Sequence, residues 1–149
     1  MRAITILAAI AWFAAPALAA PHLGDWMSCK GREATSADDR IAACDRVLQT
    51  DSLTPDETMF AYISRATAYL SKRDVDHALA DVDAATAAAP NLAAPYLLHG
   101  SINVLRHDFD KALADFSRAI AVQPNAPEAY NERGAVHLAK KEYAEALRA

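Results

Sequence analysis

A spacing of 34 residues recurs along the second half of the chain and constrains the fold more than any other feature. Residues that share a place in successive units form columns. The columns are Tyr62, Tyr96 and Tyr130; Ala66, Gly100 and Gly134; Val75, Phe109 and Tyr143; Ala78, Ala112 and Ala146; and Pro90 with Pro124. A repeat of this length predicts units that each bury their apolar face against a neighbour and stack into a curved array.

Each unit is predicted to be two helices. In the second unit the first helix runs from Tyr96 to about Arg106, and the second runs from Phe109 to about Val122. Asp74 and Asp108 stand where the second helices begin, and Asn91 and Asn125 stand before the first helices. Side chains of these types accept hydrogen bonds from free backbone N–H groups at a helix start, so we expect all four to be caps. Small residues at 66, 100 and 134 are expected where the two helices cross.

These columns resemble the tetratricopeptide repeat (TPR), and the second unit carries the pattern most completely. Its matching residues are Tyr96, Gly100, Phe109, Ala112, Phe116, Ala119 and Pro124. The resemblance covers about residues 57–149. It implies an all-α fold of antiparallel helix hairpins, a TPR-type α-solenoid, preceded by a helical N-terminal cap.

The N-terminus has the features of a bacterial Sec-type signal peptide. Arg2 is followed by an uncharged apolar stretch and by the small-residue cleavage site Ala17-Leu18-Ala19. The apolar stretch is shorter than the roughly 20 residues of a membrane-spanning helix. We therefore expect cleavage after Ala19, no membrane span in the mature chain, and a periplasmic or secreted protein that begins at Ala20.

Export makes a disulfide the leading interpretation of Cys29 and Cys44, the only cysteines in the chain. A metal site at these residues is disfavoured by too few ligands, and a free redox thiol is the remaining alternative. A W-x2-C segment and a helix with a second cysteine before the repeats also resemble small exported TPR proteins of Gram-negative bacteria. The predicted organisation is a signal peptide (1–19), a helical cap with two cysteines (20–56), two units (57–90 and 91–124) and an incomplete third unit (125–149).

Two charged columns depart from the TPR pattern. Arg65, His99 and Arg133 stand where the family often has Leu, and Asp81 and Asp115 lie 16 residues after the first two. We expect Arg65 to pair with Asp81 and His99 to pair with Asp115, within or between units.

The third unit stops early, with a second helix predicted from about Glu142 to Ala149. Either the sequence is a fragment of a longer array, or its exposed edge meets a partner or a second copy. Self-association through this C-terminal edge is therefore one alternative.

No motif in the sequence indicates an enzyme. There is no H-E-x-x-H, no phosphate-binding G-x-x-x-x-G-K-[ST] and no G-x-S-x-G. The formal net charge of −4 and the mixture of both charge signs argue against nucleic acid. We predict no catalytic residue, no cofactor and no metal.

The resemblance implies that a protein or peptide partner lies on the concave side, against the first helices. The candidate groove residues are Ile63, Thr67, Leu97, Leu98, Ser101, Val104, Asn131 and Glu132. Some adaptors of the family hold a peptide carboxylate with Lys and Arg, which are absent from these positions. A mostly apolar groove with an acidic end suits an extended or helical apolar segment. The leading hypothesis is thus a scaffold or adaptor outside the cytoplasm, and the alternative is the regulatory part of a longer exported enzyme or transport or assembly protein.

Overall fold

The computed structural model describes residues 23–32 and 36–146, with side chains to residue 141. The predicted signal peptide and the cleavage site at Ala19 lie outside these residues. The described residues form seven helices and no strand. The helices are α1 (Leu23–Cys29), α2 (Ala37–Leu48), α3 (Pro55–Ser71), α4 (Val75–Ala88), α5 (Ala93–Leu105), α6 (Phe109–Val122) and α7 (Pro127–Ala146). The all-α fold expected from the sequence is confirmed.

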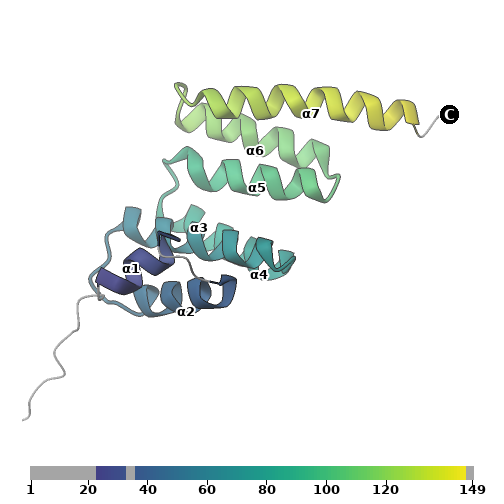
Figure 1. The fold of residues 1–149 in the computed structure, drawn as a ribbon. Helices are drawn as coiled ribbons and strands as arrows, with labels where there is room; N and C mark the ends of the chain where they lie inside the picture. Colours follow the sequence, from purple (N-terminus) through teal and green to yellow (C-terminus); the bar gives the residue numbers. More distant parts are fainter. Residues whose placement is uncertain (1–22, 33–35, 147–149) are drawn as a thin grey trace, which may run out of the picture.

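The helices stack in chain order as an array of hairpins, with α1 and α2 at one end and α7 at the other (Figure 1). Each helix packs against the next, and the first helices also touch one another, α3 against α5 and α5 against α7. Within the described residues, α4 makes no comparable contact with α6. Helices that approach more closely lie on the inside of a curve, so α3, α5 and α7 form the concave layer and the second helices diverge outside it.

Side chains that cap the free backbone N–H groups mark where several helices begin. Ser36 and Thr54 each accept a hydrogen bond from the backbone N–H three residues on, and the carboxylates of Asp39 and Glu57 bond back to them. These capping boxes lower the pKa of both carboxyls, chiefly through the hydrogen bonds from Ser36 and Thr54. A lowered folded-state pKa gives stability that is present above the ordinary carboxyl range and lost as the pH falls through it.

The prediction of four caps is correct in part. Asp74 caps α4 by accepting from the backbone N–H of His77 at 3.3 Å. Asp108 holds the cap position of α6 without a cap bond, because its carboxylate faces Lys111 at 3.4 Å. The prediction for Asn91 is wrong, because α5 begins two residues later, after Leu92, which makes no side-chain cap bond. Asn125 likewise lies two residues before the start of α7.

The crossing of the two helices in each hairpin is the centre of the core. A Cβ built on Gly100 would lie 2.6 Å from the ring of Phe116, so the ring rests directly on the α5 backbone. In the preceding hairpin the same places hold the fully buried Ala66 and Val82, which belong to one cluster. A larger residue on one helix therefore goes with a smaller residue on the other, as close packing requires.

The N-terminal pair α1 and α2 has the character of a shortened hairpin. Ala43, Cys44 and Val47 of α2 are buried, and they lie 38 residues before Asp81, Val82 and Ala85, the buried residues of α4. The matching pattern shows that α2 presents the face of a second helix, at a spacing from α4 that is four residues longer than the 34-residue period.

Cys29 and Cys44 form a disulfide that joins α1 to α2, as the sequence predicts, and the bridge is fully buried. It closes a loop over a sequence separation of 15 residues. A loop of that length corresponds to a stabilisation of about 3 kcal/mol in the chain-entropy model. The bridge fixes a seven-residue helix that is too short to be stable alone.

The prediction of a second helix from about Glu142 is wrong, because α7 continues without interruption from Pro127 to Ala146. The two earlier hairpins turn at Arg73 and His107, which have φ of 62° and 61°. Lys141 is the matching residue, and it lies inside the helix. A left-handed residue costs about 1–2 kcal/mol, whereas the Lys, Glu and Ala residues around this point favour continuous helix. The packing roles expected of Tyr143 and Ala146 fall on side chains outside the described part.

Candidate functional site

Arg65 joins three helices, which confirms the pairing predicted from the charged columns. Its guanidinium donates to both carboxylate oxygens of Asp81 in α4, at 2.8 Å and 2.6 Å, and also to Asp45 in α2. The hydrogen bond to Asp81 raises the pKa of Arg65 above its already high ordinary value. Asp81 is 5% exposed. A buried bidentate pair of this kind fixes the register of its own hairpin and of the helix before it.

His99 occupies the same position one unit later and is paired as predicted. Its Nδ1 lies 2.8 Å from Asp115 Oδ2, and the same oxygen accepts from the buried Asn103 amide at 2.8 Å. A carboxylate only accepts hydrogen bonds, so Nδ1 carries the hydrogen. The other ring nitrogen, Nε2, lies 3.9 Å from Asp83 of the preceding unit. His99 therefore lies between two units, with a hydrogen bond to Asp115 of its own unit and with Asp83 of the preceding unit nearby.

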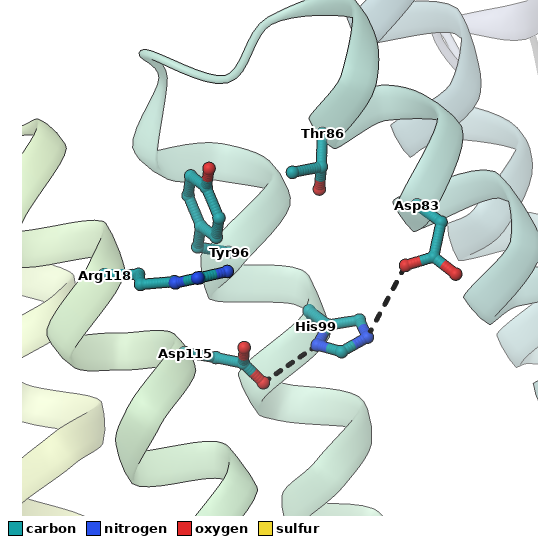
Figure 2. A pocket seen from close by; sticks show the side chains of 6 residues that line it. All are labelled: Asp83, Thr86, Tyr96, His99, Asp115 and Arg118. Carbon is teal, nitrogen blue, oxygen red and sulfur yellow. Dashed lines mark hydrogen bonds and ion pairs between the residues drawn. The ribbon is translucent and has the colours of Figure 1, made fainter.

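A small polar hollow opens beside His99 where α4 and α6 diverge. It has a volume of about 90 Å³, and its lining residues are Asp83, Thr86, Tyr96, His99, Asp115 and Arg118. Figure 2 shows Arg118 extending from α6 across the opening toward Tyr96, with His99 between the two aspartates. Ligand sites for drug-sized molecules have roughly 300 Å³ or more, so this hollow fits the side chain of a partner better than a free ligand.

The predicted groove residues divide into two groups in the structure. Ile63, Leu97, Leu98 and Val104 are half-buried and pack into clusters within and between the units. Ser101 is also half-buried, and its hydroxyl donates to the backbone carbonyl of Leu97 at 2.9 Å. The exposed members are Thr67, Asn131 and Glu132. Their role in binding stays a prediction, and the apolar part of the groove contributes mainly to the cohesion of the array.

Two leucines of α5 and α7 outside the predicted groove residues are exposed and offer apolar surface. Leu105 is 69% exposed at the end of α5, and Leu138 is 67% exposed on α7. Leu138 lies in the groove column of Leu70 and Val104. The predicted site did not include Leu105, which occupies the last position before the turn; its one sequence signal was a large apolar residue next to Arg106 and His107.

A second hollow lies at the N-terminal end, between α1 and α3, with a volume of about 190 Å³. The ammonium of Lys30 lies 4.9 Å from the ring centre of Trp26 and 5.3 Å from that of Phe60. Asp56 and Glu57 complete the lining. Cation–π contacts of this kind stabilise the docking of α1 on α3, so this hollow is already filled on one side by the chain's own lysine.

Two other kinds of site have no candidate among the described residues. No group of three or more His, Cys, Asp or Glu in that part of the chain is placed to hold a metal ion. None of the helices found there is both long enough and apolar enough to cross a bilayer.

Comparison with known proteins agrees with this architecture. Residues 100–141 match the family model described as TPR repeat. The first TPR domain of human RPAP3, solved by NMR, superposes with a TM-score of 0.67 at 23% identity, over 83% of this chain and 98% of that one. The first TPR of Spaghetti (RPAP3) bound to the HSP90 peptide SRMEEVD gives 0.62 at 22% identity, over 79% and 87%. No curated protein sequence matches the chain. The resemblance to the TPR family is confirmed, and the fold is that of TPR domains.

We predict strong coupling between Arg65 and Asp81. Replacing either residue alone, as Arg65→Met or Asp81→Asn, leaves a poorly compensated partner in a mostly buried place and should lower the free energy of unfolding by about 3 kcal/mol. The double variant should lose less than the sum of the two single losses, as measured by urea unfolding in a double-mutant cycle. Arg46→Met, which removes a pair between the more exposed Arg46 and Asp25, is the matched control and should change stability by less than about 1 kcal/mol. Strictly additive losses at Arg65 and Asp81 would show that the pair does not act as a unit.

Proposed function

We propose that this chain is a non-enzymatic scaffold or adaptor that works outside the cytoplasm and binds a protein segment along the concave layer of α3, α5 and α7. The observation that carries the proposal is the surface of that layer. The first helices α3, α5 and α7 touch one another. Each of them carries exposed side chains, among them Thr67, Leu105 and Leu138. A continuous face of parallel first helices is suited to an extended peptide or a helix laid across it.

The chemistry of this face favours an apolar, uncharged segment. Among the solved neighbours, one holds the HSP90 peptide SRMEEVD, which ends in acidic residues. In this chain the groove residues Ile63, Thr67, Leu97 and Ser101 carry no positive charge that could hold a carboxylate. Leu105 and Leu138 offer apolar anchors, and Glu132 makes one end of the face acidic. A peptide with a cluster of acids has little to pair with here, whereas apolar side chains gain from burial against the leucines.

The groove can be tested with peptides selected from a random library against the purified chain. Thr67→Glu and Leu138→Glu place charges at exposed positions, so they should leave folding intact while weakening selected peptides by about tenfold, or about 1.4 kcal/mol. Ala80→Glu and Ala114→Glu add the same charge at exposed positions of α4 and α6 and should leave affinity unchanged. Fluorescence anisotropy measures both sets. The groove assignment fails if no peptide is selected, or if the second-helix variants weaken binding and the groove variants do not.

The location outside the cytoplasm rests on the N-terminal sequence and gains support from the buried Cys29–Cys44 bridge, which is typical of oxidising compartments. We predict that the full chain, expressed in a Gram-negative host, is recovered from the periplasm with Ala20 as its first residue. Intact mass spectrometry should show the mature chain two hydrogens lighter than its dithiol form. Recovery from the cytoplasm with Met1 or Arg2 at the N-terminus would contradict the proposal.

A further inference from the structure

The outer face of α7 repeats a helix-binding surface that is occupied in the two earlier hairpins. Tyr130, Gly134 and His137 form one stripe of α7, and all three are exposed. The residues 34 positions earlier are Tyr96, Gly100 and Asn103, which pack beneath the second helix of their own unit, where Gly100 and Asn103 are buried. The rest of α7 is anchored, since Ala129 and Val136 are buried against α5 and α6. The stripe is therefore held in place with its neighbour missing from the described structure.

The shape of the stripe specifies an aromatic side chain. At Gly100 the Phe116 ring would meet an added Cβ at 2.6–2.9 Å, whereas a Cβ added at Gly134 would meet nothing within 4 Å. Glycine in the middle of a helix costs about 1 kcal/mol relative to alanine. In α5 this cost is offset by the ring that the glycine admits. On α7 the matching glycine, Gly134, leaves the backbone open on this side, so an aromatic ring could pack there as Phe116 packs on Gly100.

The charge of the stripe specifies an acid next to that ring. Arg65 and His99 each meet an aspartate from the second helix of their unit, Asp81 and Asp115 respectively. Arg133 is the third member of the column. Its guanidinium lies 5.6 Å from the ring centre of Tyr130, and no carboxylate of the described residues pairs with it. An acid placed as Asp115 is placed on α6 would complete the column.

We infer that this face of α7 binds an amphipathic helix of a partner protein that carries an acid followed directly by an aromatic residue, with small residues on either side. The two second helices of this chain define the pattern as A-x-x-D-[VF]-x-x-A. It is formed by Ala78, Asp81, Val82 and Ala85 in α4, and by Ala112, Asp115, Phe116 and Ala119 in α6. The aromatic residue rests on Gly134, the acid meets Arg133, and the partner helix packs on α7 as α6 packs on α5.

This surface differs from the concave groove of the proposed function. Gly134 and its stripe face the end of the array, whereas Ala135, one residue along, belongs to a groove-facing column and is exposed. Variants at the two neighbouring positions therefore distinguish the two surfaces, and failure of one proposal leaves the other standing.

The test uses a fluorescein-labelled peptide with the sequence of residues 109–122, which is α6 itself, added to the intact chain. Binding should be saturable by anisotropy. Gly134→Leu adds an apolar side chain whose Cβ would meet nothing within 4 Å, so the variant should fold and bind about tenfold more weakly or worse. Ala135→Leu adds the same side chain to the groove side and should leave affinity unchanged. A peptide with Asp115→Lys should bind poorly to the natural chain and regain affinity for the Arg133→Glu variant.

Each other outcome overturns the inference. The face does not bind such a helix if the peptide shows no saturable binding or binds the Gly134→Leu variant equally well. Weakening by Ala135→Leu alone places the peptide in the groove. If the chain is a dimer by sedimentation and Gly134→Leu makes it a monomer, a second copy occupies the face instead of a partner protein.

Discussion

The close crossing of two helices at a small residue is the contact on which the rest of this structure depends. At Gly100 the ring of Phe116 lies against backbone, and at Ala66 the smaller Val82 takes the same place. Each crossing sets the distance between the helices of a hairpin, and that distance brings the charged columns within reach of one another. Arg65 reaches Asp81, and His99 reaches Asp115, because each charged residue comes directly before a residue of the crossing in the sequence.

The two ends of the array are finished in different ways. At the N-terminal end, α1 is too short to be stable alone. The Cys29–Cys44 bridge holds it in place, together with the contacts of Lys30 to Trp26 and Phe60, where a longer helix would be held by packing. At the C-terminal end, α7 runs on as one helix with its outer stripe exposed. Among the described residues, the array thus has one end fixed by a disulfide and one end whose outer stripe is exposed, and this exposed stripe is the basis of the inferred second binding surface.

The features predicted well from the sequence are those that recur with the period. A column of matched residues predicted each of three features: the helix over 109–122, the small-residue crossings and both charged pairs. Such columns can be recognised in the sequence because they recur with a fixed period. The start of α2 rests on a local signal, because Ser36 and Asp39 form a capping box from residues only three positions apart. The helix starts at Asn91 and Asn125 were mispredicted because a cap position depends on the backbone path through the preceding turn, which residue type alone does not determine.

The remaining differences arise where packing overrides local pattern. Tyr143 and Ala146 keep the column spacing of a second helix, yet α7 passes through them without a turn. A turn at Lys141 requires a left-handed residue, and only the packing of a following helix offsets that cost. The groove shows the same effect, because Leu97 and Val104 follow the groove columns and also pack between helices. Position in a column predicts which face a residue lies on and leaves open how far that face is exposed.

The claim that the crossing controls the array is tested most directly by adding one methyl group at each of two matched glycines and measuring the free energy of unfolding in urea. Gly100→Ala should destabilise the chain by about 1 kcal/mol, since overpacking against Phe116 costs about 1–3 kcal/mol and the gain in helix propensity offsets about 1 kcal/mol of it. Adding Phe116→Val, which recreates the Ala66–Val82 pair, should lower stability by less than the two single losses together. Gly134→Ala makes the same change in open space and should not destabilise. Equal effects of the two alanines, or strict additivity of Gly100→Ala and Phe116→Val, would contradict the account.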